Sequence, residues 1–315
     1  MILSAFTAGR RNGNCEIYVK EALMAAEKKG IEVRLYRLTE YNLRPCIACP
    51  VLFCPASSDI TKCVAKDDAP FLAEAFLDSD GVIFAAPAYS LTANSLFFAF
   101  RDKVFGPKMD IAGPMTGMPE PPFIKGRYKH RPCGLISVGG CLHEHWTGFS
   151  LAELHTAVMS AQNEVVDHMN VYGIAQIDAA AVNDEWLEKA RKLGSNVADA
   201  MLTGDNSWRG GERGSCPSCH LDLIQIKPGT DDVMCPLCGI YGKISVKDGV
   251  TTLDWPDTPE CRQENRFTVE GKVFHLHDIN DCMTAFEPFA EQAKEKAKKY
   301  REYKSCIVAP PRRSE

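Results

Sequence analysis

The order of apolar and amphipathic segments is the feature that most constrains the fold of residues 1–204. The stretches GVIFAAPAY (81–89) and PCGLISVGG (132–140) are continuously apolar, as parallel strands are when helices cover both faces of a sheet. Further strand candidates are ILSAF (2–6), IEVRLYRL (31–38) and HMNVYGIAQIDAA (168–180). Helical patterns occupy residues 14–30, 69–77, 95–104, 150–162 and 185–202. This alternation predicts an α/β fold, a doubly wound parallel sheet of about five strands.

The character of the chain changes after residue 204. GDNSWRGGERGS (204–215) reads as a glycine-rich linker, so we predict a linker over 205–214, a small cysteine-bearing module over 215–256 and a β/helical extension over 257–315. The extension contains a charged helical segment (278–304) and ends in APPRRSE, a candidate disordered tail. Its apolar side chains at helical spacing predict a packing face: Met283, Phe286, Phe289, Ala293, Ala297 and Tyr300.

Composition excludes several partners. A net charge of -5 offers no basic footprint, so we expect no nucleic-acid partner. The start, MILSAFTAGRR, does not read as a secretory signal, and no apolar run approaches the roughly 18 residues of a membrane span. We therefore expect a cytoplasmic protein without a membrane partner. In that reducing compartment, clusters among its 14 cysteines are better read as metal ligands than as disulfides.

The strongest metal signal is a pair of C-x-x-C motifs, Cys216/Cys219 and Cys235/Cys238, in CPSCHLDLIQIKPGTDDVMCPLCG. Four thiolates from two tight knuckles suit tetrahedral zinc, and so small a β module needs a metal to fold. A rubredoxin-like iron site uses the same ligands and stays open as an alternative. His220 stands where that alternative expects glycine. We favour structural zinc in a zinc-ribbon-like module that serves docking or oligomerisation.

Three loops follow strand candidates at the carboxyl edge of the predicted sheet, where open α/β sheets bind ligands. They are TAGRRNGNC (7–15), APAYSLTANS (86–95) and SVGGCLHEH (137–145). In the first, Arg10 and Arg11 supply charge, and Asn14 opens a helix whose amides favour a phosphate. Each signal is weak alone.

Together the loops resemble the NADPH-dependent FMN reductase and iron–sulfur flavoprotein family, which has a flavodoxin-like fold. The matching residues are Arg10, Gly13, Asn14, Pro87, Tyr89, Ser90, Gly139 and Gly140. Thr7 and Ala8 replace the usual glycine and serine, and Cys15 stands where serine or threonine often caps the helix. The phosphate pocket should therefore differ in detail, with Thr7 or Ser4 providing the hydroxyl.

The resemblance implies FMN as the cofactor and assigns roles to the three loops. The implied FMN contacts are Ser4, Thr7, Arg10, Arg11, Gly13, Asn14, Cys15, Pro87, Ala88, Tyr89, Ser90, Leu91, Thr92, Ala93, Ser137, Gly139, Gly140 and Cys141. Tyr89 is expected beside the flavin ring, and His143 and His145 are candidates for protonating a substrate. The long segment 106–131, rich in glycine, proline and methionine, is a candidate lid, an oligomer contact or an ordinary surface loop.

A second cysteine set, Cys46, Cys49, Cys54 and Cys63, lies in RPCIACPVLFCPASSDITKCVAKDD (44–68). The resemblance implies a [4Fe–4S] cluster in such a loop. Here the gaps between cysteines are two, four and eight residues, so the ends fit the family pattern and the middle is stretched. We keep both a cluster with these four ligands and a cluster-free loop as hypotheses.

The leading functional hypothesis is an FMN-dependent oxidoreductase. A reduced nicotinamide, NAD(P)H, or a protein donor would pass electrons through FMN to a quinone, an unsaturated or nitro compound, or free flavin. The alternative is an electron carrier that links FMN, a [4Fe–4S] cluster and a ferredoxin-type partner. A zinc-ribbon scaffolding or regulatory protein is a lesser alternative. The resemblance also implies a homodimer or homotetramer.

Overall fold

The computed structural model describes residues 1–49, 54–57, 59–105, 109, 112–118, 120–161, 163–211 and 214–308. The chain divides into two compact units, residues 1–273 and 274–315, and each is described by itself. Within the described residues, no helix is long and apolar enough to cross a membrane.

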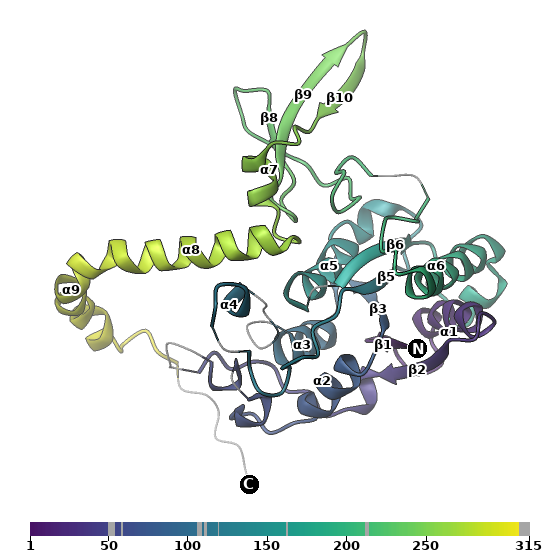
Figure 1. Ribbon diagram of the computed structural model, residues 1–315, viewed down its shortest axis with the longest axis horizontal. Coiled ribbons are helices and arrows are strands. Elements are labelled where there is room, and N and C mark those ends of the chain that lie inside the picture. The colour runs from purple at the N-terminus through teal and green to yellow at the C-terminus, as the bar shows by residue number, and fades with distance from the viewer. Residues whose placement is uncertain are drawn as a thin grey trace. The chain divides into compact units, whose positions relative to one another are not determined.

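A twisted parallel sheet forms the centre of the first unit, with strand order β2-β1-β3-β5-β6 (Figure 1). The strands are β1 (Ile2–Thr7), β2 (Glu32–Arg37), β3 (Gly81–Tyr89), β5 (Arg131–Val138) and β6 (Asn163–Val171). A short strand, β4 (Thr92–Ala93), folds back antiparallel on the end of β3. The predicted doubly wound, flavodoxin-like α/β fold is confirmed.

Helices cover both faces of the sheet and split the core in two. One apolar cluster joins the sheet to α1 (Asn14–Glu27) and α6 (Asp184–Thr203). The other joins it to α2 (Ala69–Leu77), α3 (Ser95–Val104) and α5 (Ser150–Ala161). Burial of apolar residues on both faces of β3 and β5 explains why their sequences are continuously apolar. Short 3-10 turns complete this part: η1 (Leu38–Glu40), η2 (Pro55–Ser57), η3 (Ile60–Lys62), η5 (Glu144–Thr147) and η6 (Ala179–Val182).

One sequence prediction about this unit needs correction. The last strand begins at Asn163, not His168, and residues 172–180 lie outside it. β6 is an edge strand whose exposed positions include Glu164, so it lacks the continuous apolar run that marks the central strands. The described part of the predicted linker is packed rather than free, because the backbone N–H groups of Arg209 and Gly210 both donate to the carbonyl of Val166.

The predicted lid, residues 106–131, lies partly outside the described residues. It contains α4 (Ala112–Met115), and its later part is anchored. Ile124 is buried, and Arg127 pairs with Glu74 and Asp78 around α2. The lid and oligomer-contact roles stay predictions.

The cysteine module forms a second, antiparallel sheet. Its strands are β7 (Gln225–Ile226), β8 (Asp232–Met234), β9 (Tyr241–Lys247) and β10 (Val250–Asp254). Helix α7 (Pro259–Glu264) follows, and α8 (Val269–Phe286) begins in this unit. The second unit continues α8 through the turn η7 (Glu287–Phe289) into α9 (Ala290–Glu302).

The second unit differs from the single helix predicted over 278–304, since Pro288 lies in the break between α8 and α9. The side chains of the predicted packing face that are large and apolar, Met283, Phe286, Phe289 and Tyr300, are all exposed. The predicted tail, 309–315, lies outside the described residues.

Candidate functional site

The first predicted flavin loop follows β1 and leads into α1. Gly13 is the capping residue of α1 and supplies no side-chain hydrogen bond, so the first amides of the helix lack a side-chain acceptor. Such an uncapped N-terminus, with Arg10 exposed beside it, is suited to a phosphate. Thr7 accepts a hydrogen bond from the Gly9 N–H (3.2 Å). Asn14 instead holds the loop after β6, donating to the Gln176 carbonyl (2.6 Å).

Ser4 and Cys15 lie deeper than the other predicted FMN contacts. Ser4 is inside β1 and accepts a hydrogen bond from Ser79 (2.7 Å). Cys15 is buried against Thr7, and burial raises the pKa of its thiol to about 12. Cys15 is therefore a neutral packing group at physiological pH. Arg11 points to Glu40, with 3.6 Å between the charged atoms.

The second loop is a tight hairpin between β3 and β4. Ser90 and Leu91 both have left-handed backbone angles (φ 51° and 74°). Two-residue hairpins of the type I′ kind require this arrangement, and residues other than glycine, asparagine and aspartate rarely adopt it. Strain of this kind is concentrated at functional sites. The turn holds Tyr89 at the sheet edge with 58% of its surface exposed. Pro87, Ala88, Thr92 and Ala93 form the strands on either side.

The third loop, after β5, depends on close packing around two glycines. A Cβ atom on Gly139 would collide with the Thr147 side chain, and one on Gly140 would lie 3.3 Å from the Ala175 backbone. Ser137, near the end of β5, is fully buried, and its hydroxyl has no partner among the described residues. A buried hydroxyl without a partner beside a ligand-binding edge fits a bound polar group.

Hydrogen bonds join the three loops. Asn94 caps α3 and donates to the Ala8 carbonyl (2.8 Å), which ties the second loop to the first. The Phe149 N–H donates to the Leu91 carbonyl (3.2 Å), which ties the third loop to the second. Glu153 of α5 accepts from the Ala93 N–H (2.5 Å). Neither Asn94 nor Glu153 was predicted as a site residue, because the sequence shows only that Asn94 directly follows a strand and that Glu153 lies within a helix.

An ion pair between Glu16 and Arg37 holds the first loop in place. Glu16 accepts hydrogen bonds from Arg37 (2.8 and 3.0 Å) and from the Asn12 N–H (3.1 Å). Burial alone would raise the pKa of Glu16, but the bonds from Arg37 and Lys20 lower it to about 2. The sequence analysis missed this pair as well, because its members are 21 positions apart.

Large apolar side chains are exposed around the second and third loops. Tyr89, Leu142, Trp146 and Phe149 are 58%, 77%, 52% and 52% exposed. Clustered exposed apolar groups mark a surface that a ligand or another subunit covers. His143 and His145 lie in the third loop with stacked rings, 5.6 Å between centroids, and their catalytic role stays a prediction.

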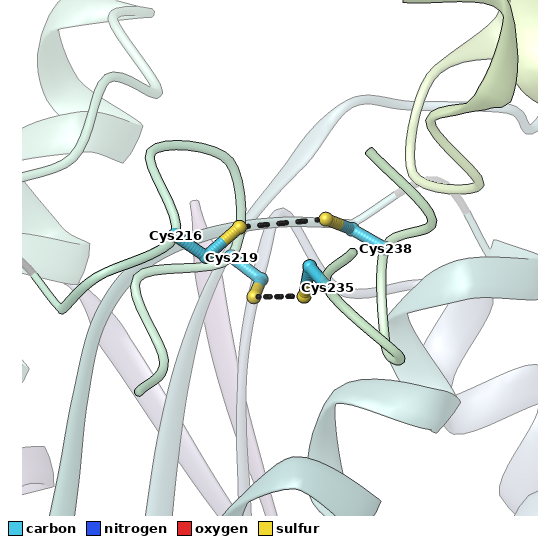
Figure 2. A group of neighbouring side chains, drawn as sticks. All are labelled: Cys216, Cys219, Cys235 and Cys238. Carbon is cyan, nitrogen blue, oxygen red and sulfur yellow. Dashed lines mark hydrogen bonds between the residues drawn. The ribbon is translucent and has the colours of Figure 1, made fainter. Parts of the chain in front are cut away.

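The two C-x-x-C pairs form one compact centre (Figure 2). The sulfur atoms of Cys216 and Cys238 are 3.5 Å apart, as are those of Cys219 and Cys235, and all four lie within 4.8 Å of one another and are buried. Zinc–sulfur bonds of about 2.3 Å in a tetrahedron place sulfurs about 3.8 Å apart. Contacts with Cys216 raise the pKa of Cys219 and Cys238, so four thiolates here need a cation. The residues fit a tetrahedral metal.

The earlier cysteine set is not gathered in this way. Among the described residues, the cysteine module is the one group of three or more potential ligands within metal-binding distance, although residues 50–53 between Cys49 and Cys54 are not described. Cys63 instead accepts a hydrogen bond from the Lys103 ammonium (2.8 Å). Lys103 also pairs with Asp67 (3.1 Å), and both side chains are 1% exposed. As described, this loop does not fit a four-thiolate cluster.

The fold and the three joined loops define a flavoprotein of the flavodoxin-like class. Residues 3–147, somewhat less than half of the chain, match the NADPH-dependent FMN reductase family, so the predicted resemblance of the N-terminal domain to that family is confirmed. The protein is accordingly an oxidoreductase of the FMN-dependent type.

Two relatives extend over nearly the whole chain. The flavone synthase cfoJ of Aspergillus candidus is 28% identical over 321 residues and covers 98% of this chain and 97% of its own. A solved structure of a flavone reductase superposes with a TM-score of 0.77 at 24% identity, covering 98% of this chain and all of its own. It therefore shares the fold. An iron–sulfur flavoprotein of Methanocaldococcus jannaschii is 25% identical over 200 residues, 61% of this chain and 92% of its own.

Proposed function

We propose that the protein exchanges two electrons between a reduced nicotinamide and an aromatic ketone of the flavone type. The observation that carries this proposal is the extent of similarity to the flavone synthase, 98% of this chain, which takes in the cysteine module and the C-terminal helices. The similarity to the iron–sulfur flavoprotein spans 61%. A shared flavin domain would not by itself require the rest of the chain to match.

The three loops would hold FMN, which when bound supplies hydride-equivalent redox chemistry. The uncapped start of α1 would take the phosphate, and the strained Ser90–Leu91 turn would lie along the ring. In the reductive direction the reaction adds two hydrogens to the carbon–carbon double bond conjugated with the ketone, one as a hydride equivalent and one as a proton. The flavone synthase is named for the reverse direction, in which the flavone is formed. His143 and His145 are the candidate proton donors. The donor, NADH or NADPH, loses the two electrons that the bond gains.

Zinc is the metal we propose for the cysteine module. Its four buried sulfurs belong to two matched knuckles, in which the N–H of His220 donates to Cys216 and that of Gly239 donates to Cys235. All four positions are filled by protein ligands, which is the arrangement of a structural site. Tetrahedral iron is the other metal that this geometry accepts.

The direct test uses the full chain loaded with FMN, mixed anaerobically with NADPH or NADH and a flavone. We expect a product two hydrogens heavier by mass spectrometry and one nicotinamide oxidised per product. Protein stripped of FMN is the control and should form none. Nicotinamide oxidation without any heavier product, with a quinone accepted instead, would contradict the flavone assignment and leave a general FMN reductase.

The second candidate is an iron–sulfur electron carrier with a ferredoxin-type partner, favoured by the similarity of the flavin domain to the iron–sulfur flavoprotein of Methanocaldococcus jannaschii. It requires Cys46, Cys49, Cys54 and Cys63 to gather, whereas Cys63 pairs with Lys103. Acid-labile sulfide in anaerobically purified protein would establish this candidate. The lesser alternative, a zinc-ribbon scaffolding protein, would bind no FMN. For either redox function we propose a homodimer or homotetramer, which light scattering would check.

A further inference from the structure

A cavity of about 720 Å³ lies along the edge of the sheet and reaches the end of the third loop assigned to FMN. Its floor is the edge strand β6, of which residues 167–170 line it. Helix α6 contributes Trp186, and the segment after α6 contributes Trp208. The first cysteine knuckle contributes His220. The volume is within the range of small-molecule sites.

The cavity begins where the third flavin loop ends. Glu144, His145 and Gly148, all just beyond the predicted flavin turn at 139–141, line it. His145 is one of the two predicted proton donors. The cavity therefore extends from the end of the third flavin loop to the first cysteine knuckle.

Aromatic rings form its inner wall. Trp208 stacks on His220 with 4.0 Å between ring centroids and an interplanar angle of 29°, and it meets His168 edge-on at 4.9 Å. Tyr172 and Trp186 form a second aromatic pair at 5.5 Å, and both line the cavity. Such walls favour a flat aromatic ligand.

His220 occupies its place at the cost of backbone strain. Its φ is +60°, whereas the equivalent position of the second knuckle is Gly239 at +92°. Side chains rarely adopt this conformation, so a knuckle with no other task would carry glycine at both positions. The histidine is the residue that brings the module into contact with Trp208.

Two lining residues carry polar atoms that no described protein group satisfies. The indole N–H of Trp208 and the amide oxygen of Asn170 are both shielded from water and unpaired. The orientation of Asn170 is fixed, because Thr147 donates its hydroxyl hydrogen to the Glu144 carbonyl (2.7 Å) and must accept from the Asn170 NH₂ (2.8 Å). The site thus holds one hydrogen-bond donor and one acceptor without a protein partner. Leaving a buried polar group without a hydrogen bond costs free energy, and a ligand could supply both bonds.

The charges of the cavity oppose an anionic ligand. Lys189 is paired with Glu185 (2.7 Å) and lies 4.2 Å over the Trp186 ring. The lining holds the lysines Lys189 and Lys192 and the carboxylates Glu144, Asp167 and Asp222, so the positive charge is not in excess. Burial lowers the pKa of His168 to about 4, which keeps its ring neutral at pH 7. A polyphosphate finds no concentrated positive charge here, and an uncharged ligand suits the cavity better.

We infer that this cavity binds an uncharged, hydroxylated aromatic ketone between the flavin domain and the cysteine module, with the ketone or an ether oxygen accepting from Trp208 and a hydroxyl donating to Asn170. This inference rests on the proposed function, because it names where the aromatic ketone binds. It gives the cysteine module a role in binding the substrate, through His220. It also makes Trp208 and Asn170 specificity-determining residues.

The test measures the binding of apigenin, a hydroxylated flavone, to the FMN-loaded full chain by calorimetry. We expect Trp208→Phe, which keeps a ring and removes the N–H, to weaken binding about tenfold, and Asn170→Ala to weaken it by a similar factor. The matched control is Trp255→Phe, which removes an indole N–H that donates to Ser215 (2.9 Å) outside the cavity. It should leave apigenin affinity unchanged. Zinc and FMN content verify that each variant is folded.

The outcomes separate this inference from the proposed function. If the protein reduces flavones but the affinity of folded Trp208 and Asn170 variants matches that of the control, the cavity assignment is wrong and the function stands. If the variants lose apigenin affinity although no flavone is reduced, the binding site stands and the function is wrong. Competition between NADPH and apigenin, with NADPH affinity also lost in the variants, would identify a nicotinamide site and overturn the inference.

Discussion

The chain has two sets of four cysteines that are each close together in the sequence, and the two sets have different structures. In the module, residues 216–238, paired knuckles bring four buried sulfurs within 4.8 Å of one another. In the loop after β2, the thiol of Cys63 accepts a hydrogen bond from Lys103 instead of meeting the other thiols. Both sets have four cysteines, so the number of thiols does not decide metal binding.

The difference lies in what fixes each backbone. A C-x-x-C knuckle closes itself, since the N–H after the second cysteine returns to the carbonyl of the first, at 3.0 Å in one knuckle and 2.9 Å in the other. The gaps of two, four and eight residues in the other set provide no such repeated closure. Local hydrogen bonds therefore position the thiols of the module. The thiols of the loop are positioned by contacts with more distant residues, such as that of Cys63 with Lys103.

The largest expected effect comes from Cys219→Ser. It removes one of four metal ligands, so we expect loss of stoichiometric zinc and of much of the roughly 10–16 kcal/mol that structural zinc contributes in such modules. Elemental analysis and limited proteolysis of residues 215–256 measure both. Cys46→Ser is the matched control and should retain the full metal content. Loss of iron from Cys46→Ser would show that the loop does hold a cluster.

Next in size is Lys103→Met. It leaves the Asp67 carboxylate buried without its cation, which we expect to cost about 3–5 kcal/mol in the free energy of unfolding. Urea denaturation followed by fluorescence measures this cost. Lys62→Met, on the exposed turn η3, should change it little. Equal stability of the two variants would mean that Lys103 and Asp67 are not paired in solution.

A third prediction concerns the thiol of Cys63. Burial raises its pKa, but the bonds from Lys103 and from the Ala65 backbone lower it further, so the net pKa lies below the usual value. A lowered pKa means more thiolate at pH 7, and we expect Lys103→Met to slow alkylation of Cys63 about tenfold for each pKa unit regained. Peptide mass spectrometry after iodoacetamide labelling at several pH values follows the titration. An unchanged pH midpoint would refute the role of Lys103.

The smallest effect is expected for His220→Gly. Relief of the strained backbone, about 1–2 kcal/mol, offsets the lost stacking on Trp208, about 0.5–1.5 kcal/mol. Zinc content should stay stoichiometric and module stability should change by about 1 kcal/mol or less. Gly239→Ala is the contrast, because its Cβ would lie 2.6 Å from the Glu264 carbonyl oxygen. Faster zinc loss to a chelator from the His220 variant than from the Gly239 variant would contradict this comparison.

The sequence predicted the parts of the fold that local pattern controls. Continuous apolar runs marked β3 and β5, and helix bounds such as 69–77 and 95–104 agree with α2 and α3. The start of β6 was missed because its first residues include the polar Asn163, Glu164 and Asp167, which interrupt the apolar run. The segment around Trp208 looked like a linker because only its tertiary contacts, with His168 and His220, order it.

The candidate site divides in the same way. The three loops could be predicted because each follows a strand at one edge of the sheet. The residues that hold them together, such as Asn94 and Glu153, could not, because their contacts join distant positions. The cavity could not be predicted from the sequence either, because Asn170, Trp208 and His220 come together only in the folded chain.

The most direct test of the central claim is to reduce the FMN-loaded protein anaerobically with dithionite and then add a flavone. We predict that the flavin absorbance returns with one reduced flavone formed per flavin, without oxygen or a protein acceptor present. Flavin that stays reduced in the presence of excess flavone, yet reoxidises with a ferredoxin-type protein, would contradict the claim and identify an electron carrier.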